Sequence, residues 1–181
     1  AVRNPKCVAR KGSILASAIE LEGRAGVALW DARHPCTPPF SMCCPEKQTP
    51  CHLRFSGSSL LAANYHEGLC LEQDQVRIFG RKFSPRGVIL FPADSGPRHG
   101  IFHPKDRTLW MVTERSHELY HFNYADTRYQ LLQQVSILPK DHPEYAASTT
   151  AAIRLSPDGR FLYTSTRGAD IMSVFALDAD G

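Results

Sequence analysis

The chain has 181 residues, enough for one ordinary core, and its charge is nearly balanced: 21 basic and 18 acidic residues give a formal net charge of +3. The lack of a long basic run argues against a nucleic-acid partner, and the lack of an apolar stretch near the roughly 18 residues of a membrane helix argues against a membrane partner. No signal peptide is visible and the first residue is Ala1, which predicts a cytoplasmic protein whose start is an internal boundary or a processed end.

Short apolar runs bounded by turn residues predict strands in the first half of the chain. The clear runs are residues 13–19, 26–30, 52–55 and 60–64. Two segments are irregular. Residues 31–49 fit an outer strand poorly because they hold four prolines and three cysteines, and within 69–95 only 76–79 and 88–91 have a convincing strand pattern.

Four of the six cysteines lie close together with the spacing C-x6-C-C-x6-C, at Cys36, Cys43, Cys44 and Cys51. This spacing is not a usual one for zinc, even with a histidine two residues before Cys36. Reduced thiols in a cytoplasmic protein are the favoured interpretation. We therefore predict neither a metal ion nor another cofactor.

The second half of the chain predicts two repeats with the same order of strands. The expected strands of the earlier repeat are residues 98–103, 109–112, 119–124 and 129–137. Those of the later repeat are residues 153–156, 161–165 and 172–177, with no fourth strand after them. A turn rich in proline and charge follows the first strand of each repeat, PKDR in the earlier and PDGR in the later one. The segment 166–168 is expected to connect the second and third strands of the later repeat.

These two repeats begin with similar sequences. RHGIFHPKDRTLWMVTERS at 98–116 matches AAIRLSPDGRFLYTSTRGA at 151–169, and a weaker copy occupies 51–68. Repetition at a period of roughly 50 residues, with four short antiparallel strands per period, predicts an all-β propeller. The strands amount to about three and a half blades, so we expect residues 1–181 to form a partial propeller. Because a ring of typically 4–8 blades is needed for closure, further blades or self-association would complete it.

The blade plan also predicts where functional side chains meet. Strands one and two of a blade are antiparallel, so the start of strand one lies beside the end of strand two. His99 opens strand one of its blade, Glu114 closes strand two, and Arg167 takes the Glu114 position in the next blade. We expect these three side chains at one rim, with the proline turns at the opposite end. Glu20 and His52 take comparable positions in earlier blades.

Histidine, glutamate and arginine at one rim suit the hydrolysis of an anionic ester. A carboxylate or an imidazole activates water as a general base, and a guanidinium binds a phosphate or carboxylate or stabilises an oxyanion. We therefore predict His99, Glu114 and Arg167 as the catalytic residues, with Glu114 or His99 as the base, and a small anionic substrate. The predicted substrate-binding residues are Arg98, Arg154, Glu20 and His52, with Arg167 also binding the anion.

Structural explanations remain open for each of these residues. His99 can cap its own blade, Glu114 can pair with Arg115 in solvent, Arg167 can be a solvated turn residue, and Arg154 can pair with a neighbouring blade. His142 lies on the long connection that reaches the same rim, where a plain surface loop is the favoured interpretation. No nucleophile motif of the G-x-S-x-G kind and no phosphate-binding glycine loop is present.

Three stretches resemble the seven-bladed propeller lactonase family: GPRHGIFHP at 96–104, LWMVTER at 109–115 and AAIRLSPDGRFLYTSTRG at 151–168. The resemblance is specific over 96–178 and weaker upstream. It implies a metal-free hydrolase that converts 6-phospho-D-glucono-1,5-lactone to 6-phosphogluconate in the pentose phosphate pathway. It also places His99 on the histidine of the family's GPRH motif, and Glu114 and Arg167 on its rim positions.

Two other functions remain as alternatives. One is a cycloisomerase or lactonase that acts on a carboxylated lactone. The other is a non-catalytic propeller that binds partners at its mouth, because a fold alone does not determine function. An enzyme predicts a polar pocket with converging charges, whereas a scaffold predicts exposed apolar or aromatic side chains around the rim.

Overall fold

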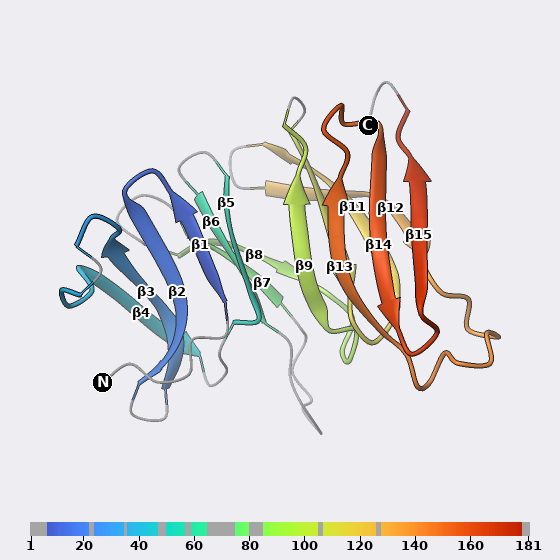
Figure 1. Ribbon diagram of the computed structural model, residues 1–181, viewed down its shortest axis with the longest axis horizontal. Coiled ribbons are helices and arrows are strands. Elements are labelled where there is room, and N and C mark those ends of the chain that lie inside the picture. Colours follow the sequence, from blue (N-terminus) through green and yellow to red (C-terminus); the bar gives the residue numbers. More distant parts are fainter. Residues whose placement is uncertain are drawn as a thin grey trace. The chain divides into compact units, whose positions relative to one another are not determined.

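The computed structural model describes residues 7–21, 24–34, 36–46, 50–56, 59–64, 75–79, 85–104, 107–125 and 128–178. All secondary-structure elements in this described part are β-strands. The strands form three four-stranded sheets and one three-stranded sheet, and neighbours in sequence are hydrogen-bonded neighbours in each sheet (Figure 1). Consecutive antiparallel sheets of four strands are the blades of a propeller, so the predicted all-β propeller fold is confirmed. The described residues divide into two compact units, one up to Leu90 and one from Phe91 onward.

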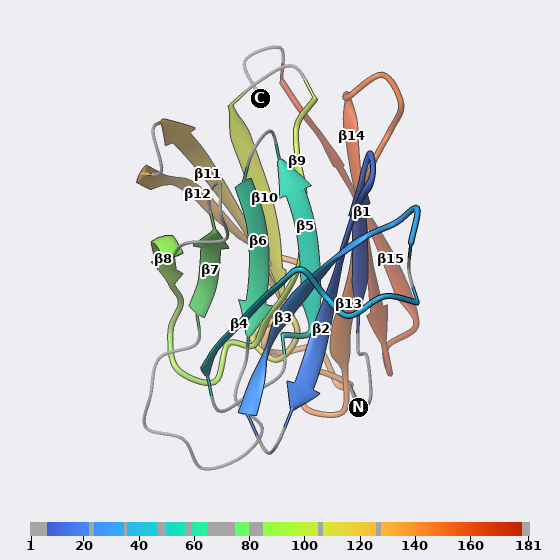
Figure 2. The same ribbon diagram turned by 90° about the vertical axis from the view of Figure 1, so that its left-hand side faces the viewer.

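The first unit contains two blades. The strands of the first blade are β1 (Val8–Lys11), β2 (Ile14–Leu21), β3 (Arg24–Asp31) and β4 (Ser41–Glu46). Those of the second are β5 (His52–Ser56), β6 (Ser59–Asn64), β7 (Gln75–Phe79) and β8 (Pro85–Leu90). Strands β1 and β2 contact β5 (Figure 2). The four clear sequence-based strands are confirmed, while β1 was not expected.

Both irregular segments contain the outer strands that the blade plan requires. β4 lies within 31–49, and β7 and β8 lie within 69–95. The reason for their irregular sequences is their position: β4 and β8 are the outermost strands of their sheets. An outer strand accepts proline because one of its edges makes no ladder hydrogen bonds. Pro45 and Pro85 stand in these two strands.

The second unit contains a complete blade and a three-stranded one. The first comprises β9 (Pro97–Phe102), β10 (Thr108–Thr113), β11 (Glu118–Ala125) and β12 (Arg128–Ser136). The second comprises β13 (Thr149–Leu155), β14 (Phe161–Arg167) and β15 (Ile171–Ala176). β13 begins four residues earlier than predicted, because a bulge between Thr150 and Ile153 takes up the small residues there. Arg167 ends β14 and does not belong to the connection that follows.

Apolar side chains fill the space between the two sheets of the second unit. Strand β10 is buried along its whole length and, with β9, packs on β13. The buried residues of this core are Trp110, Val112, Leu119, Ile137, Ile153 and Leu162. The rim residues are therefore mounted on the ends of well-packed strands and not on a free loop.

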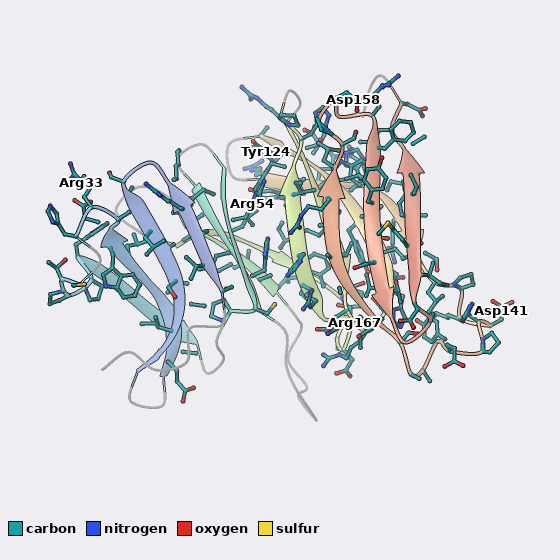
Figure 3. All side chains as sticks on the ribbon, in the orientation of Figure 1. Arg33, Arg54, Tyr124, Asp141, Asp158 and Arg167 are labelled. Carbon is teal, nitrogen blue, oxygen red and sulfur yellow. The ribbon has the colours of Figure 1, made fainter. Side chains whose placement is uncertain are left out.

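The two ends of β14 carry different groups, as the sequence predicted. Arg167 lies at one end of the strand and Asp158 at the other, in the PDGR turn (Figure 3). The Asp158 carboxylate accepts hydrogen bonds from Ser156 Oγ (2.6 Å) and from Arg160 Nε (2.7 Å). These bonds to the charged form hold the pKa of Asp158 well below its usual range. This end of the blade is a self-contained turn, remote from Arg167.

Candidate functional site

Main-chain hydrogen bonds fix the position of Glu114. It directly follows β10, and its amide donates to the carbonyl of Gly96 just before β9 (2.6 Å). Its carbonyl accepts from the amide of Thr150 at the start of β13 (3.0 Å). The residue is thus tied to three strands from two blades, and its side chain is only 10% exposed.

The Glu114 carboxylate meets two guanidinium groups. Arg167 Nη2 donates to Glu114 Oε1 at 2.5 Å, and Arg98 Nε lies 3.4 Å from the same oxygen. The Arg98 side chain is 23% exposed and that of Arg167 is 57% exposed, so both cations reach solvent. The other oxygen, Oε2, is buried and has no hydrogen-bond partner among the described residues. We refer to Arg98, His99, Glu114 and Arg167 as the rim cluster.

His99 joins the rim cluster through Arg98. The Nη1 atom of Arg98 donates to the carbonyl of Ala151 (2.5 Å) and lies 3.3 Å from His99 Nε2. Because a guanidinium only donates, this contact makes Nε2 an acceptor and leaves the imidazole proton on Nδ1. Arg98 therefore links the carboxylate, the imidazole and the next blade.

The chemistry of the rim cluster follows from its charges. One carboxylate between two guanidinium groups leaves one net positive charge, which favours an anionic ligand. A buried carboxylate oxygen without a partner is costly, so it favours a ligand or water that brings an O–H donor. The arrangement can therefore hold an anion and a hydroxyl-bearing group together.

The structure brings four of the predicted residues together: Arg98, His99, Glu114 and Arg167. Arg154 lies further along β13, three residues beyond Ala151 toward the proline turn, where its Nη1 donates to the carbonyl of Ile153 (2.7 Å). The prediction that Arg154 belongs to the same rim is not supported by this position. Glu20 and His52 lie in β2 and β5 of the first unit, so their part in a shared site stays a prediction.

Two structural alternatives are answered by the observed contacts. Arg115 pairs with Asp94 (Nη2 to Oδ1, 3.7 Å), not with Glu114, which is buried. His142 accepts from the amide of Glu144 through Nδ1 (3.2 Å), as expected of a surface loop. One buried histidine, His117, was not singled out by any sequence pattern.

Other parts of the described chain add no competing site. The Sγ atoms of Cys7 and Cys51 donate to the carbonyls of Pro50 (3.5 Å) and Ala63 (3.3 Å), and the Cys43 and Cys44 side chains lie outside the described residues. No group of three or more metal-ligating side chains occurs in the described part. A cavity of about 240 Å³ in the second unit, lined by residues such as Trp110 and Phe175, contains no predicted site residue. Across the described ranges, no helix is long and apolar enough to cross a membrane.

Two buried histidines predict a loss of stability in mild acid. Burial lowers the pKa of both His117 and His121 from the ordinary 6.5, and the charge of His103 lowers that of His121 further. The unfolded chain therefore binds more protons than the folded one just below pH 6.5, and the free energy of unfolding falls as the pH drops. Each histidine contributes up to about 1.4 kcal/mol per pH unit in this window.

Urea unfolding between pH 8 and pH 5 measures this slope. We expect a His121→Asn variant, which removes the imidazole stacked 3.7 Å from the Trp110 ring, to unfold with a shallower dependence on pH. An unchanged slope would show that His121 does not contribute to it.

The comparisons with known proteins agree with the fold. A family model described as a lactonase with a seven-bladed β-propeller matches residues 69–181. The chain belongs to this lactonase family. The match covers the whole of the β9–β15 region and therefore the complete rim cluster.

Among curated proteins, this lactonase chain is 31% identical over 120 residues to the 6-phosphogluconolactonase of Yersinia enterocolitica. The alignment covers 62% of this chain and 35% of that protein, so the chain spans about a third of the length of the curated relative.

Solved structures support the fold alone. The periplasmic gluconolactonase of Pseudomonas aeruginosa has a TM-score of 0.70 at 24% identity, over 92% of this chain and 51% of that one. A chain of the mitotic checkpoint complex has a TM-score of 0.67 at 16% identity, over 92% and 47%. Since such different proteins share the fold, the fold does not determine the function.

Proposed function

We propose that the protein hydrolyses an anionic sugar lactone at the rim cluster. The observation that carries the proposal is the buried Glu114 carboxylate, with one oxygen bound to Arg167 and Arg98 and the other without a protein partner. Membership of the lactonase family and the name of the Yersinia relative support the reaction class. The enzyme is accordingly a carboxylic-ester hydrolase.

In this mechanism, the Glu114 carboxylate accepts a proton from a water molecule as that water attacks the lactone carbonyl carbon. A C–O bond forms, and the carbonyl oxygen becomes an oxyanion that the Arg98 guanidinium stabilises, while Arg167 binds the anionic group of the substrate. When the oxyanion collapses, the ring C–O bond breaks and the leaving ring oxygen takes up the proton. The product is an open-chain hydroxy acid. The role of His99 is to position Arg98 by accepting a hydrogen bond from its guanidinium.

For the substrate, we propose 6-phospho-D-glucono-1,5-lactone, hydrolysed in the pentose phosphate pathway of the cytoplasm. The net positive charge of the rim cluster and the name of the curated relative support a phosphorylated lactone. We also propose that residues 1–181 form part of one lactonase propeller. On this model the first unit supplies earlier blades, and Glu20 and His52 lie on their rims.

The preference for a phosphate tests the substrate. We expect Arg167→Gln to raise KM for 6-phosphogluconolactone by about 10- to 100-fold, since a charge-assisted hydrogen bond contributes about 1.5–3 kcal/mol. The KM for unphosphorylated glucono-1,5-lactone should change much less. The matched control is Arg160→Gln at the other end of β14, whose guanidinium pairs with Asp158.

Three results would count against the substrate. Equal effects of Arg167→Gln on both lactones would exclude phosphate recognition by this residue. Turnover of a carboxylated lactone in preference to both would favour a carboxylate-specific enzyme. Tight binding of 6-phosphogluconate without any turnover would indicate a binding scaffold.

A further inference from the structure

His117 lies three residues after Glu114, where the chain turns into β11. It is 1% exposed and has a φ angle of +52°, which is uncommon for a residue other than glycine. Its carbonyl accepts from the amide of Ile137 (2.8 Å), so the turn also receives the end of β12. Nothing in the proposed reaction uses this imidazole, yet it is buried beside the rim cluster.

The hydrogen bonds of the imidazole have a fixed direction. His117 Nε2 lies 3.2 Å from the carbonyl oxygen of Tyr145, which can only accept, so Nε2 carries the proton. Burial lowers the pKa of His117, which keeps the ring neutral and makes Nδ1 an acceptor. Thr150 Oγ1, 3.0 Å from Nδ1, therefore donates to it, and Thr166 Oγ1, 3.2 Å further on, donates to Thr150.

This row of hydrogen bonds connects the main chains of the two residues of the ion pair, Glu114 and Arg167. Thr150 donates its amide to the carbonyl of Glu114 (3.0 Å), and Thr166 directly precedes Arg167. The row therefore joins the main chain that carries the carboxylate to the main chain that carries the guanidinium.

The same histidine fixes the connection between the two blades. The Tyr145 ring lies edge-on to the His117 ring, with centroids 4.7 Å apart, and its hydroxyl donates to the carbonyl of Ser116 (3.2 Å). Further along, Ser148 Oγ accepts from the amide of Ala169 (2.9 Å). The connection 137–148 is thus attached to the chain on both sides of the rim cluster.

We propose that His117 is a positioning residue for the rim cluster: as a neutral ring protonated on Nε2, it sets the direction of the His117–Thr150–Thr166 row and so keeps Glu114 and Arg167 in register. The inference rests on the proposed function for its effect on turnover. For the state of the ring it rests on the hydrogen bonds and the burial of His117, which do not depend on the activity.

Threonine variants separate positioning from packing. Thr150→Val keeps the volume and strand preference but interrupts the row, and we expect kcat for 6-phosphogluconolactone to fall about tenfold with little change in KM. Thr150→Ser keeps the hydroxyl and should restore kcat. The matched control is Thr164→Val, because Thr164 is equally buried in the neighbouring strand and its hydroxyl has no hydrogen-bond partner among the described residues.

The state of the ring is tested without substrate. Ring nitrogen chemical shifts of His117 should show a proton on Nε2 and none on Nδ1 from pH 8 to pH 6, and the Arg98 Nε–H signal should shift in Thr150→Val but not in Thr164→Val. A proton on Nδ1, or an unchanged Arg98 signal in Thr150→Val, would overturn the inference. If the native protein hydrolyses no lactone while these signals behave as expected, the proposed function fails and the positioning role stands.

Discussion

Replacing Glu114 with glutamine is expected to lower kcat for the lactone by about 100-fold or more, the range for loss of a general base. Glutamine has nearly the same shape, so it can still contact Arg167 and Arg98, but it cannot take a proton from water. The substitution also leaves two guanidinium groups without their shared counter-charge. We expect a stopped-flow or coupled assay of 6-phosphogluconolactone hydrolysis to show the loss mainly in kcat.

The control for this variant is Glu118→Gln. Glu118 is a nearby carboxylate outside the rim cluster that accepts hydrogen bonds from Tyr120 and Gln134, and its loss should leave kcat within a few-fold of native. His99→Ala should have a smaller effect than Glu114→Gln, because Arg98 already contacts its Nε2. Unchanged turnover in both Glu114→Gln and His99→Ala would rule out the assignment of the site.

Replacing Gly168 with alanine is expected to lower the free energy of unfolding of the second unit by about 3 kcal/mol. Its φ angle of +91° is unfavourable for a residue with a Cβ atom, which costs about 1–2 kcal/mol. The added Cβ would also lie 2.8 Å from the carbonyl oxygen of Ala147 and 2.9 Å from the Cα of Ser148. Both are main-chain atoms of the 137–148 connection, so relief requires a backbone shift, typically at a further cost of 1–3 kcal/mol.

Gly12→Ala is the matched control for this variant. Gly12 also has a positive φ, +57°, but no atom lies within 4 Å of its added Cβ, so only the conformational cost of about 1 kcal/mol remains. Trp30 lies in the first unit and Trp110 in the second, so urea unfolding in Trp30→Phe and Trp110→Phe backgrounds reports the two units separately. Equal losses for both glycine variants would show that the contact with the connection adds nothing.

The pairing of strand ends could be deduced from the sequence because it depends only on antiparallel geometry. His99 and Glu114 flank a hairpin with a proline turn, and Arg167 takes the same position in the repeated phrase, so their convergence follows from the strand plan. The position of Arg154, away from the rim cluster, has a physical reason. The bulge between Thr150 and Ile153 lets β13 start earlier, which leaves Arg154 well down the strand from the rim.

Other features depend on contacts that no local pattern shows. The contacts of Arg98 are one example. Its Nη1 donates to the Ala151 carbonyl only because β9 packs on β13. His117 occupies a polar stretch, yet the connection 137–148 folds over it and buries it. His117 and Tyr145 are 28 residues apart in the sequence, so this burial depends on contact between distant segments.

The way in which the connection 137–148 is attached has an evolutionary consequence. It is held by the Tyr145 carbonyl at His117 and by the side chains of Tyr145 and Ser148, so these bonds do not depend on the other side chains of the connection. Lys140, Asp141 and Glu144 on the same connection are exposed, and Figure 3 shows Asp141 toward the same end of the blade as Arg167. These positions are free to drift without disturbing the anchoring bonds. A lineage can therefore alter the charge that an approaching ligand meets while its proton-transfer machinery stays in place.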